Sequence, residues 1–498
     1  RPNMNTTYNQ TIDQAQEYIS VNSENGMLSL PTRLNGFKQT HFKQQEFVRN
    51  EGTKANPFIR KRIEYSFLGS YEDPEGKELR KCPVCGALMH KNGTNVTRLR
   101  HLPFGDSYTV IEASRVRYRC TNCEHSEFIP IGFKTEGHLI TEQLKHYTES
   151  LLAYGHTLKS VANITGLNKS LVKDIDKARL EALYVREKEN GRRELIKPEV
   201  QARYLGIDEF KLHDGYKYAT HITDLETGCI LWIQAGKKKK VVYDFIEHVG
   251  LEWMSNVIAI SADMNSDFEE AFKEKCPHLK IVYDYFHIVK NFNEKVVSEV
   301  RKDEQRRLIE EGNEEAAEAL KGSKYILTSS RNTLLAKDDA AHKGEVISKG
   351  SELFKKDEVK QTGGQMGRYL QLLSQNTLLF NLDYVKTILN EAYKLDSEEK
   401  MTTYIDEIIS YCKSTENCHF KWFANLLENH KEGIVSHAKY RISNGKIEGI
   451  NQKIKTIRRQ SYGLPDDEYF FLKLFDASRQ KWNHSLERST MRSHIFLY

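Results

Sequence analysis

Short runs of apolar residues, separated by turn residues, predict β-strands in the middle of the chain. Three such runs cover Tyr204–Ile207, Tyr216–Thr223 and Ile230–Gln234, and the segments between them contain Asp214-Gly215 and Glu226-Thr227-Gly228. Turn residues at this spacing join neighbouring strands into hairpins. This part of the pattern therefore predicts three antiparallel strands.

The pattern that follows alternates between helix and strand. A helical run at Val241–Val249 precedes the apolar run Val257–Ile260, and a helix around Ser266–Lys275 precedes the strand Lys280–Tyr283. Hairpins followed by alternating helices and strands predict a mixed α/β sheet in the ribonuclease-H-like order rather than a purely parallel sheet. From residue 287 to about 440 the pattern becomes helical and charged, which predicts a large all-helical insertion.

Residues 157–175 predict two short helices joined by a tight turn. Ala162 is small enough to let the helices approach, and Gly166 permits the turn. The apolar contacts between the helices are expected from Leu167, Val172 and Ile175. This arrangement is typical of a helix-turn-helix motif, whose second helix enters the major groove of DNA. The polar side chains available on that helix are Asn168, Lys169, Lys173 and Lys177. An ordinary helical hairpin is the alternative, and it would need no basic flank.

Four of the eight cysteines form two C-x-x-C pairs, Cys82 with Cys85 and Cys120 with Cys123. Each pair places two thiolates on one side of a turn, so two pairs can close a tetrahedral zinc site. Four unrelated buried thiols are the alternative. The run before the second pair alternates apolar residues with Arg115, Arg117 and Arg119. Alternation of period two points these arginines to one face of a strand, so we predict a structural zinc ribbon that presents them to DNA.

An amphipathic helix is predicted near the C-terminus, with Ser443 as its N-cap. Its buried stripe consists of Ile447, Ile450, Ile454 and Ile457. Another face carries Glu448, Gln452, Lys455 and Arg459. Between residues 436 and 460, seven basic residues accompany a single acid, Glu448. We expect Glu448 to hold a cation, whereas the alternative is a salt bridge to Lys446 or Lys455. The bases expected to hold DNA phosphates are Lys453, Lys455, Arg458 and Arg459.

Length and charge narrow the class of protein. The chain has 498 residues, well above the roughly 250 to 300 at which a single core stops growing, so we expect several domains. The net charge of +5 is modest, but nine basic and four acidic residues fall between positions 77 and 125. No apolar run approaches the roughly 18 to 20 residues that cross a bilayer, and the start has no secretory pattern. We expect a cytoplasmic, DNA-associated protein with no membrane partner.

Two aspartates each follow a predicted apolar strand directly. Asp208 comes after Leu205–Ile207, and Asp263 comes after the run ending at Ala262. Either acid alone would be explained as a turn residue or a helix cap. If the two strands are neighbours, however, the carboxylates converge, and hard oxygen donors of this kind hold magnesium or manganese. Asp284 also follows a strand. We favour Asp263 as the second ligand because its strand is longer and more apolar, and should be central in the sheet.

These patterns predict six segments. They are a polar arm or small accessory domain (1–76), a zinc ribbon (77–135), a helix-turn-helix domain (136–197), the first part of a ribonuclease-H-like core (198–290), a helical insertion (291–440) and the C-terminal helices of the core with the glutamate (441–498).

From about residue 82 to 480, the chain resembles the DDE transposases of the ISL3 insertion-sequence family. The matching features are the paired cysteines, Gly206–Phe210, Asp284–Lys290, Ser443–Gly445, Glu448-Gly449, Lys453–Lys455, Arg458-Arg459 and Tyr462-Gly463. The resemblance implies an acid triad at Asp208, Asp263 and Glu448. The spacing of Asp284 and His287 is similar to an auxiliary motif of Mutator-type transposases. His287 is then expected to orient the scissile phosphate or a carboxylate, whereas the structural alternative has Asp284 as a helix cap with His287 packed beside it.

The resemblance implies a transposase that cleaves and joins double-stranded DNA with two Mg²⁺ or Mn²⁺ ions. Asp208 would contact both ions, and Asp263 and Glu448 one each. The ribbon and the helix-turn-helix would bind the terminal inverted repeats, and synapsis of two ends implies a homodimer. Two other functions stay open: a DNA-binding protein without catalysis, derived from a transposase, and a structure-specific nuclease that cuts without joining. Loss of any one acid should abolish chemistry and spare DNA binding.

Overall fold

The computed structural model describes residues 18–20, 28–52, 54–74, 81–198, 200–215, 217–264, 266–342, 364–442, 445–460 and 466–479. The chain divides into two compact units. The first contains Arg1–Glu194 and Arg458–Leu472, and the second contains Leu195–Ile457 and Lys473–Tyr498. Ser443, Asn444, Tyr462, Gly463 and the segment 480–498 lie outside the described residues, so the predicted cap at Ser443 is not described.

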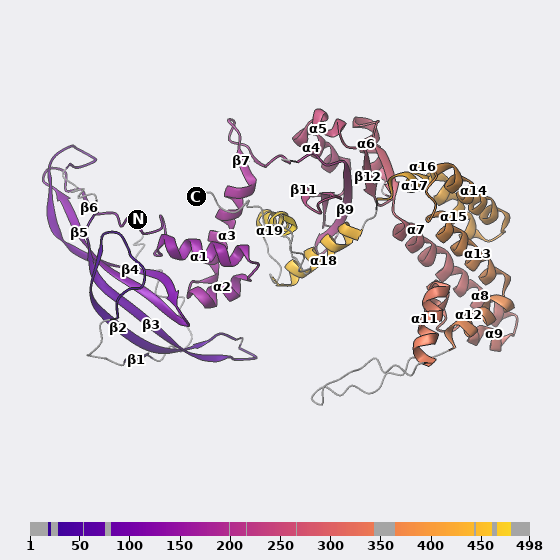
Figure 1. The fold of residues 1–498 in the computed structure, drawn as a ribbon, viewed down its shortest axis with the longest axis horizontal. Coiled ribbons are helices and arrows are strands. Elements are labelled where there is room, and N and C mark those ends of the chain that lie inside the picture. The colour runs from indigo at the N-terminus through magenta and orange to yellow at the C-terminus, as the bar shows by residue number, and fades with distance from the viewer. Residues whose placement is uncertain are drawn as a thin grey trace. The chain divides into compact units, whose positions relative to one another are not determined.

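A six-stranded sheet with long, twisted strands dominates the first unit (Figure 1). Its strands are β1 (Tyr18–Ser20), β2 (Phe37–Asn50), β3 (Ile59–Tyr71), β4 (Met89–Phe104), β5 (Ser107–Cys120) and β6 (Ser126–Phe128). The order is β1-β2-β3-β5-β4, with β6 paired to β5. Strands β3 and β5 run parallel, while the other neighbours run antiparallel.

The boundary predicted between residues 76 and 77 falls inside this sheet. Strand β3 from the polar N-terminal segment pairs along seven residues with β5 from the cysteine-containing segment, from Glu64 opposite Tyr108 to Ser70 opposite Ser114. The described strands of residues 37–71 therefore belong to the same layer as the cysteine segment and are not a separate arm. The sequence of β2 is largely polar, whereas β3 carries Ile63, Tyr65 and Phe67 at alternate positions. Phe42 of β2 packs against Phe67 of β3, with ring centroids 5.4 Å apart.

Three helices follow the sheet in the first unit, and each begins with a side-chain cap. They are α1 (Glu142–Ala153), α2 (Leu158–Thr165) and α3 (Lys169–Tyr184), capped by Thr141, Thr157 and Asn168. Gly166 adopts the left-handed conformation (φ +73°) at the end of α2, so the turn forms where the sequence predicted it. The predicted apolar positions are buried in one helical core: Ala162, Leu167, Val172 and Ile175. A short hairpin, β7 (Val185–Glu187) with β8 (Arg193–Leu195), comes next.

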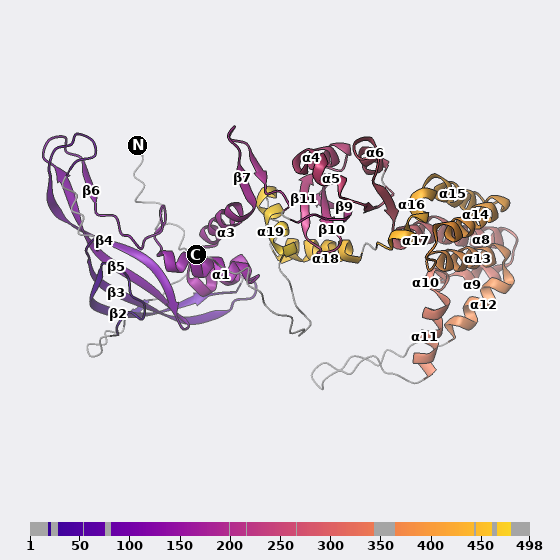
Figure 2. The same ribbon diagram turned by 45° about the horizontal axis from the view of Figure 1, so that its top comes forward.

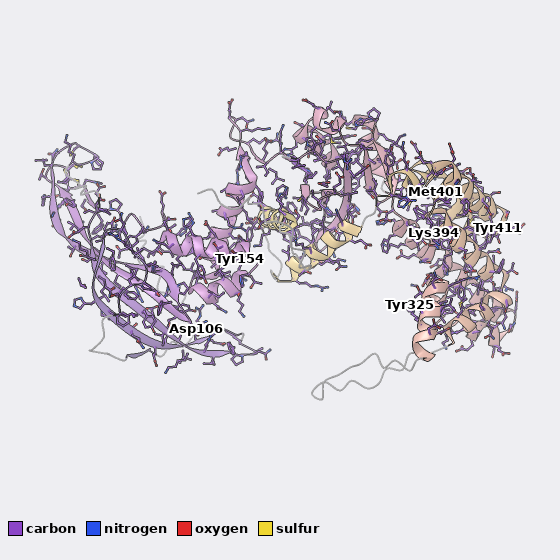
Figure 3. The ribbon with its side chains drawn as sticks, in the orientation of Figure 1. Asp106, Tyr154, Tyr325, Lys394, Met401 and Tyr411 are labelled. Carbon is purple, nitrogen blue, oxygen red and sulfur yellow. The ribbon has the colours of Figure 1, made fainter. Side chains whose placement is uncertain are left out.

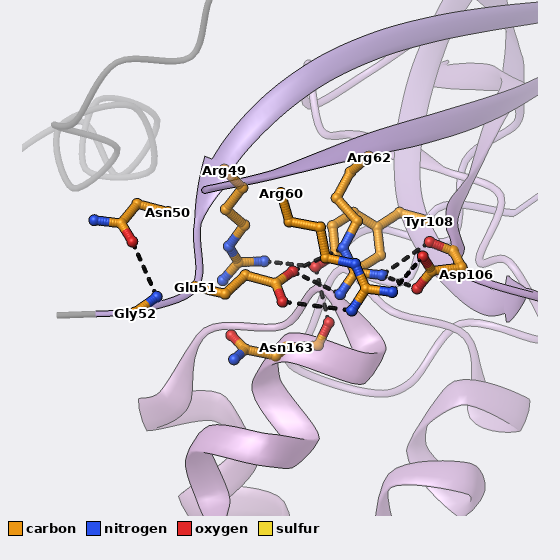
Figure 4. A network of polar contacts seen from close by, with 9 residues as sticks. All are labelled: Arg49, Asn50, Glu51, Gly52, Arg60, Arg62, Asp106, Tyr108 and Asn163. Atoms are coloured by element: carbon orange, nitrogen blue, oxygen red, sulfur yellow. Dashed lines mark hydrogen bonds and ion pairs between the residues drawn. The ribbon is translucent and has the colours of Figure 1, made fainter. Parts of the chain in front are cut away.

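Polar contacts around Tyr108 join the sheet to helix α2 (Figure 4). The Tyr108 hydroxyl accepts a hydrogen bond from Arg49 and donates one to the backbone oxygen of Asn163, each at 2.8 Å. Three guanidinium groups, from Arg49, Arg62 and Arg100, lie 5.3 to 5.8 Å from its ring centroid. Arg62 is 5% exposed and is neutralised by Glu51 and Asp106. This arginine cluster therefore stabilises the fold and is not a free basic surface.

The second unit is built on a mixed five-stranded sheet, as predicted. Its strands are β9 (Tyr204–His213), β10 (Lys217–Asp224), β11 (Ile230–Ala235), β12 (Ala259–Ala262) and β13 (Lys280–Tyr283), in the order β11-β10-β9-β12-β13. The first three are antiparallel, and β12 is parallel to both β9 and β13. The helices of this part are α4 (Lys239–Val249), α5 (Leu251–Ser255) and α6 (Ser266–Lys275).

Two details of the strand predictions were wrong. Strand β9 continues to His213, so Asp208 lies within the strand and not directly after it. Strands β12 and β13 have four residues each, so β12 is not the longer of the two, although it is the more central because it lies between β9 and β13. Tyr216, the predicted start of the second strand, lies outside the described residues.

Between β13 and residue 440 the described residues form helices, as predicted, and they pack as one group (Figure 1). The elements are α7 (Tyr285–Asn291), the π-helix η1 (Phe292–Val297), α8 (Ser298–Glu310), α9 (Glu314–Leu320), α10 (Lys324–Thr328), α11 (Arg331–His342), α12 (Gln365–Gln375), α13 (Thr377–Ala392), α14 (Glu398–Ser414), α15 (Cys418–Asn429), α16 (Lys431–Val435) and α17 (His437–Tyr440). Met401 is fully buried among them, while Tyr325 is 77% exposed (Figure 3).

Two more helices complete the described chain, α18 (Gly445–Gln460) and α19 (Asp467–Arg479). The predicted apolar stripe of α18 is confirmed for Ile447, Ile450 and Ile454, which are buried, whereas Ile457 is half-buried. Helix α18 lies alongside the second unit's sheet in both views (Figures 1 and 2). A Cβ atom at Gly206 of β9 would lie 2.3 Å from Ile447 Cδ1, so the missing side chain is what allows this close approach. None of the described helices is long and apolar enough to cross a membrane.

Candidate metal centres and nucleic-acid interface

The four predicted cysteines gather at one end of the first unit's sheet. Their sulfur atoms all lie within 4.8 Å of one another. Cys82 and Cys120 are buried, and Cys85 and Cys123 are exposed. The pKa of Cys120 is lowered to about 6 because the backbone N–H groups of Cys123 and Asn122 donate to its sulfur. A thiolate favoured in this way, within a compact set of four sulfurs, fits a closed four-thiolate zinc site.

The strands that carry Asp208 and precede Asp263 are neighbours, as predicted. In the parallel pair β9–β12 the last matched residues are Ile207 and Ala262; Asp208 is the next residue of β9, and Asp263 directly follows β12. Each carboxylate accepts a hydrogen bond from the N–H of the following residue, at 2.8 Å for Asp208 and 2.7 Å for Asp263. The two aspartates therefore follow the last matched pair at the same end of the parallel strands.

Asp208 is also bound from helix α18. Asn451 donates from Nδ2 to Asp208 Oδ2 at 2.7 Å. The other end of the same amide, Asn451 Oδ1, lies 3.3 Å from His221 Nε2. His221 is the residue directly opposite Asp208 on β10, and its Nδ1 lies 3.0 Å from Thr223 Oγ1. Burial lowers the pKa of His221.

Asp263 has a different partner, His287 of α7. His287 Nδ1 lies 3.3 Å from Asp263 Oδ1, and the aspartate side chain is 52% exposed. Asp284, the competing candidate, is the N-cap of α7 and accepts from the N–H of Phe286 at 3.2 Å. Asp284 therefore caps a helix, as the structural alternative predicted. His287 contacts the carboxylate of Asp263.

Glu448 lies in the first turn of α18, on the exposed side. It follows Ile447, which packs against Gly206, and precedes by one helical turn Asn451, which binds Asp208. Among the described residues, the four cysteines are the one group of three or more His, Cys, Asp or Glu with ligand atoms within 4.8 Å of one another. Glu448 thus lies on the helix that contacts β9, and the three acids do not form a set as tight as the cysteines.

A fourth carboxylate, Glu209, stands beside this region. Its Oε2 is buried and makes no hydrogen bond in the described part of the chain. Burial raises the pKa of Glu209, as do the charges of Asp208 and Asp263, while Lys237 opposes the shift. Lys237 lies 4.4 Å from the ring centroid of Tyr218. The negative charges of Asp208 and Asp263 therefore act on Glu209, and such a group of carboxylates favours a bound cation.

The three arginines of β5 have different surroundings. Arg117 and Arg119 are exposed, and they contact Ser126 Oγ at 2.8 Å and Glu124 Oε1 at 3.1 Å respectively. Arg115 is half-buried, donates to the backbone oxygen of Ile129 at 3.1 Å, and has a pKa lowered by burial. Arg115 is therefore used by the fold, whereas Arg117 and Arg119 face solvent.

Of the polar residues predicted to contact DNA from the second helix of the hairpin, some are exposed and others are bonded within the protein. Lys169 is exposed, but the Asn168 side chain is the N-cap of α3 and accepts from the N–H of Ser170 at 2.7 Å. Lys173 and Lys177 lie 3.3 and 3.0 Å from Asp466 Oδ2, directly before α19. The basic side of α3 is thus partly neutralised by the chain itself.

The basic residues of α18 differ in the same way. Lys453 donates to the backbone oxygen of Ala477, and burial lowers its pKa. Lys455 and Arg459 are exposed, and Arg458 is half-buried. Of the four bases expected to hold phosphates, Lys453 is therefore held inside the second unit.

The sequence pattern did not single out Asn451 or His221. Asn451 is four residues after Ile447 and three before Ile454, so it occupies a core-facing position of the apolar stripe. A lone amide at such a position needs hydrogen-bond partners inside the protein. An asparagine among the isoleucines of the stripe was therefore the sequence feature that could have pointed to this role. His221 had no equivalent signal, because its role depends on the strand register opposite Asp208.

Comparison with known proteins gives two family matches. Residues 205–474 match the model of the ISL3-type DDE family described as "Transposase". Residues 78–123 match a family described as "zinc-finger of transposase IS204/IS1001/IS1096/IS1165".

Individual relatives agree with these matches. The chain is 27% identical to the transposase for insertion sequence element IS1001 of Bordetella parapertussis, over 82% of this chain and 90% of that one. It is 21% identical to the transposase for insertion sequence element IS1557 of Mycobacterium tuberculosis, over 78% of this chain and 84% of that one.

Proposed function

Because the chain belongs to the ISL3 family of DDE transposases, we propose that it binds the terminal inverted repeats of an insertion sequence, cleaves DNA there and joins the freed end to target DNA. The sheet order β11-β10-β9-β12-β13, with three antiparallel strands followed by two parallel ones, supports a ribonuclease-H-like catalytic domain.

One observation carries the catalytic proposal. Asp208 and Asp263 directly follow Ile207 and Ala262, the last paired residues of β9 and β12. Helix α18, which carries Glu448, packs on the same sheet. Residues 205–263 and the helix beginning at Gly445 are far apart in the sequence, and the contact of Ile447 with Gly206 brings α18 onto β9. We assign Asp208, Asp263 and Glu448 as the metal-binding acids.

The residues present fit divalent magnesium or manganese, because their donors are carboxylate oxygens and Asp263 and Glu448 are accessible to solvent. When bound, such ions activate the attacking hydroxyl and stabilise the leaving oxygen of a phosphodiester. The chain's own contribution is to hold the carboxylates in position: Asn451 orients Asp208, and His287 orients Asp263.

DNA recognition is assigned to the first unit. The four-cysteine site fits structural zinc and would stabilise the end of β4 and β5, from which Arg117 and Arg119 project. Helices α2 and α3, with the left-handed Gly166 between them, support a helix-turn-helix motif. Lys169 of this motif, with Lys455 and Arg459 of α18, is proposed to contact DNA phosphates.

The test combines a labelled inverted-repeat end, a target plasmid and Mg²⁺. Asp208→Asn, Asp263→Asn and Glu448→Gln are each expected to lower cleavage and joining roughly a thousandfold, because loss of a metal ligand removes several kcal/mol of transition-state stabilisation. DNA binding should be unchanged. Asp214→Asn, an exposed turn residue paired with Lys211, is the matched control.

The other two functions are outcomes of the same assay. DNA binding without cleavage by the wild-type protein would select a non-catalytic binding protein, and cleavage without joined product would select a nuclease. Full cleavage by all three acid variants would refute the assignment of the site. Synapsis of two ends requires two copies of the chain, so the complex with DNA should sediment as at least a homodimer.

A further inference from the structure

Asn451 is a polar side chain within an apolar stripe, and this position requires an explanation. Its neighbours on the buried face of α18 are Ile447 and Ile454, which are 1% and 3% exposed. An amide in such a place costs free energy unless both of its ends are hydrogen-bonded. Both ends are, because Nδ2 contacts Asp208 and Oδ1 contacts His221.

The direction of each hydrogen bond follows from the end at Asp208. An ionised carboxylate only accepts, so Asn451 must donate to it from Nδ2 and must turn Oδ1 toward His221. His221 therefore donates from Nε2–H. In the neutral ring Nδ1 is then the acceptor, and it faces Thr223 Oγ1 at 3.0 Å. The hydrogen bonds that link Thr223 to His221, His221 to Asn451 and Asn451 to Asp208 thus have one consistent set of donors and acceptors.

This series of hydrogen bonds joins three elements at the proposed metal site. Thr223 and His221 belong to β10, Asp208 to β9 and Asn451 to α18. Glu448 lies three residues before Asn451 in α18. The hydrogen bonds of Asn451 therefore restrain the helical turn that carries Glu448.

We propose that Asn451, oriented by His221, is a positioning residue that holds Asp208 and the Glu448 turn in the geometry needed to bind divalent metal. This inference rests on the proposed function, because it assumes that Asp208 binds metal. Partners of metal ligands typically contribute 10- to 100-fold to metal affinity. The competing explanation is that Asn451 only anchors α18 to the sheet.

Asn451→Leu separates these explanations. Leucine fits the apolar stripe and removes both hydrogen bonds, so a purely anchoring role predicts a lower thermal midpoint and unchanged metal affinity. The positioning role predicts a roughly 10- to 100-fold weaker affinity for Mn²⁺. Mn²⁺ alone is the probe, measured by electron paramagnetic resonance titration of the full chain, with thermal unfolding recorded on the same samples.

His221 adds a second readout. Because His221 acts through Asn451, His221→Leu should weaken Mn²⁺ binding less than Asn451→Leu, and the double variant should bind no more weakly than Asn451→Leu alone. Additive losses would contradict the proposed relay. If Asn451→Leu unfolds the chain, Asn451→Ala provides the test, because it removes both hydrogen bonds and adds no charge, and should also weaken Mn²⁺ binding.

The two levels of the proposal fail in different ways. If Asp208→Asn binds Mn²⁺ as tightly as the wild type, the metal site itself is wrong and this inference is overturned with it. If Asp208→Asn loses Mn²⁺ while folded Asn451→Leu or Asn451→Ala keeps it, the metal site stands and the positioning role is wrong.

Discussion

Gly206 determines how closely helix α18 can approach the sheet. A Cβ atom there would lie 2.3 Å from Ile447 Cδ1 and 2.8 Å from Leu225 Cδ2, both closer than packed atoms tolerate. Ile447 is 1% exposed and has little room to move aside. The absence of a side chain at residue 206 therefore permits the contact between Asn451 and Asp208.

Gly206→Ala should accordingly destabilise the second unit. We expect a loss of about 1 to 3 kcal/mol in the free energy of unfolding, the usual cost of overpacking a core. Gly449→Ala, in the same helix with open space around its Cβ position, is the control. It should stabilise by roughly 0.5 to 1 kcal/mol, because alanine favours the helix. Urea unfolding measures both, and equal midpoints would contradict the prediction.

His101 gives the first unit a predictable response to pH. The ring is 1% exposed and lies between Thr32 Oγ1 at 2.6 Å and Thr141 Oγ1 at 2.9 Å. Burial lowers its pKa to about 4. Between its ordinary pKa of about 6.5 and this value, the unfolded chain takes up a proton that the folded chain does not.

Stability should therefore fall as the pH drops from about 6.5 to about 4. The contribution of His101 is at most about 3 kcal/mol over this range. Urea unfolding of the wild type and of His101→Gln at several pH values isolates it, because the other titrating groups are shared. Glutamine should make the pH dependence shallower, and parallel curves for the two proteins would refute the assignment.

At the scale of elements, the first turn of α19 covers the basic side of α3. Asp466 contacts Lys173 and Lys177, and Tyr469, which is fully buried, donates from its hydroxyl to Asp176 at 2.6 Å. The Asp466 hydrogen bond raises the pKa of Lys177. In the proposed helix-turn-helix these two lysines face an acid, which competes with DNA phosphates for them.

Asp466→Asn should therefore increase DNA affinity. Asparagine still caps α19 in place of Asp466, which accepts from the N–H of Tyr469, so the change removes mainly a charge. Two released lysines should steepen the slope of log K against log salt by up to about two. Fluorescence anisotropy at several salt concentrations measures this. Glu398→Gln, a first-turn acid of α14, is the control, and an unchanged slope in Asp466→Asn would contradict the competition.

The elements of the second unit were more predictable than those of the first. Helix α6 and strand β13 have the predicted bounds, because α6 repeats its apolar residues at helical spacing and β13 is a short apolar run. Strand β2 was missed because polar residues occupy most of both faces. Strand β3 was missed although Ile63, Tyr65 and Phe67 alternate with polar residues. The extension of β9 past Asp208 was missed because its pairing with β10, and not its own apolar content, continues the strand.

At the scale of the whole molecule, the chain has two compact units with separate cores. Cys82 and Cys120 belong to the core of the first unit's sheet, whereas Cys276 belongs to the core of the second. The proposed zinc site therefore belongs to the first unit, and loss of zinc should lower the stability of that unit.

Zinc removal should destabilise the first unit and largely spare the second. Structural zinc contributes directly to folding, so a chelator or Cys120→Ser should lower one of two calorimetric transitions and abolish zinc binding, measured by mass spectrometry. Cys276→Ser should lower the other transition and retain the zinc. A single transition, shifted equally by both variants, would contradict this separation.

The sequence by itself determined the mixed sheet, the helical insertion, the cysteine set and the candidate acids, because each depends on local periodicity or on the spacing of a few residue types. Only the tertiary structure decided which of these groups have partners. It showed Lys453 and Arg115 bonded internally, Lys173 and Lys177 opposite Asp466, and Asn451 on Asp208. The physical reason is that a side chain's burial and hydrogen-bond partners come from segments remote in the chain, whose strand register and helix packing are set by the cooperative folding of each unit.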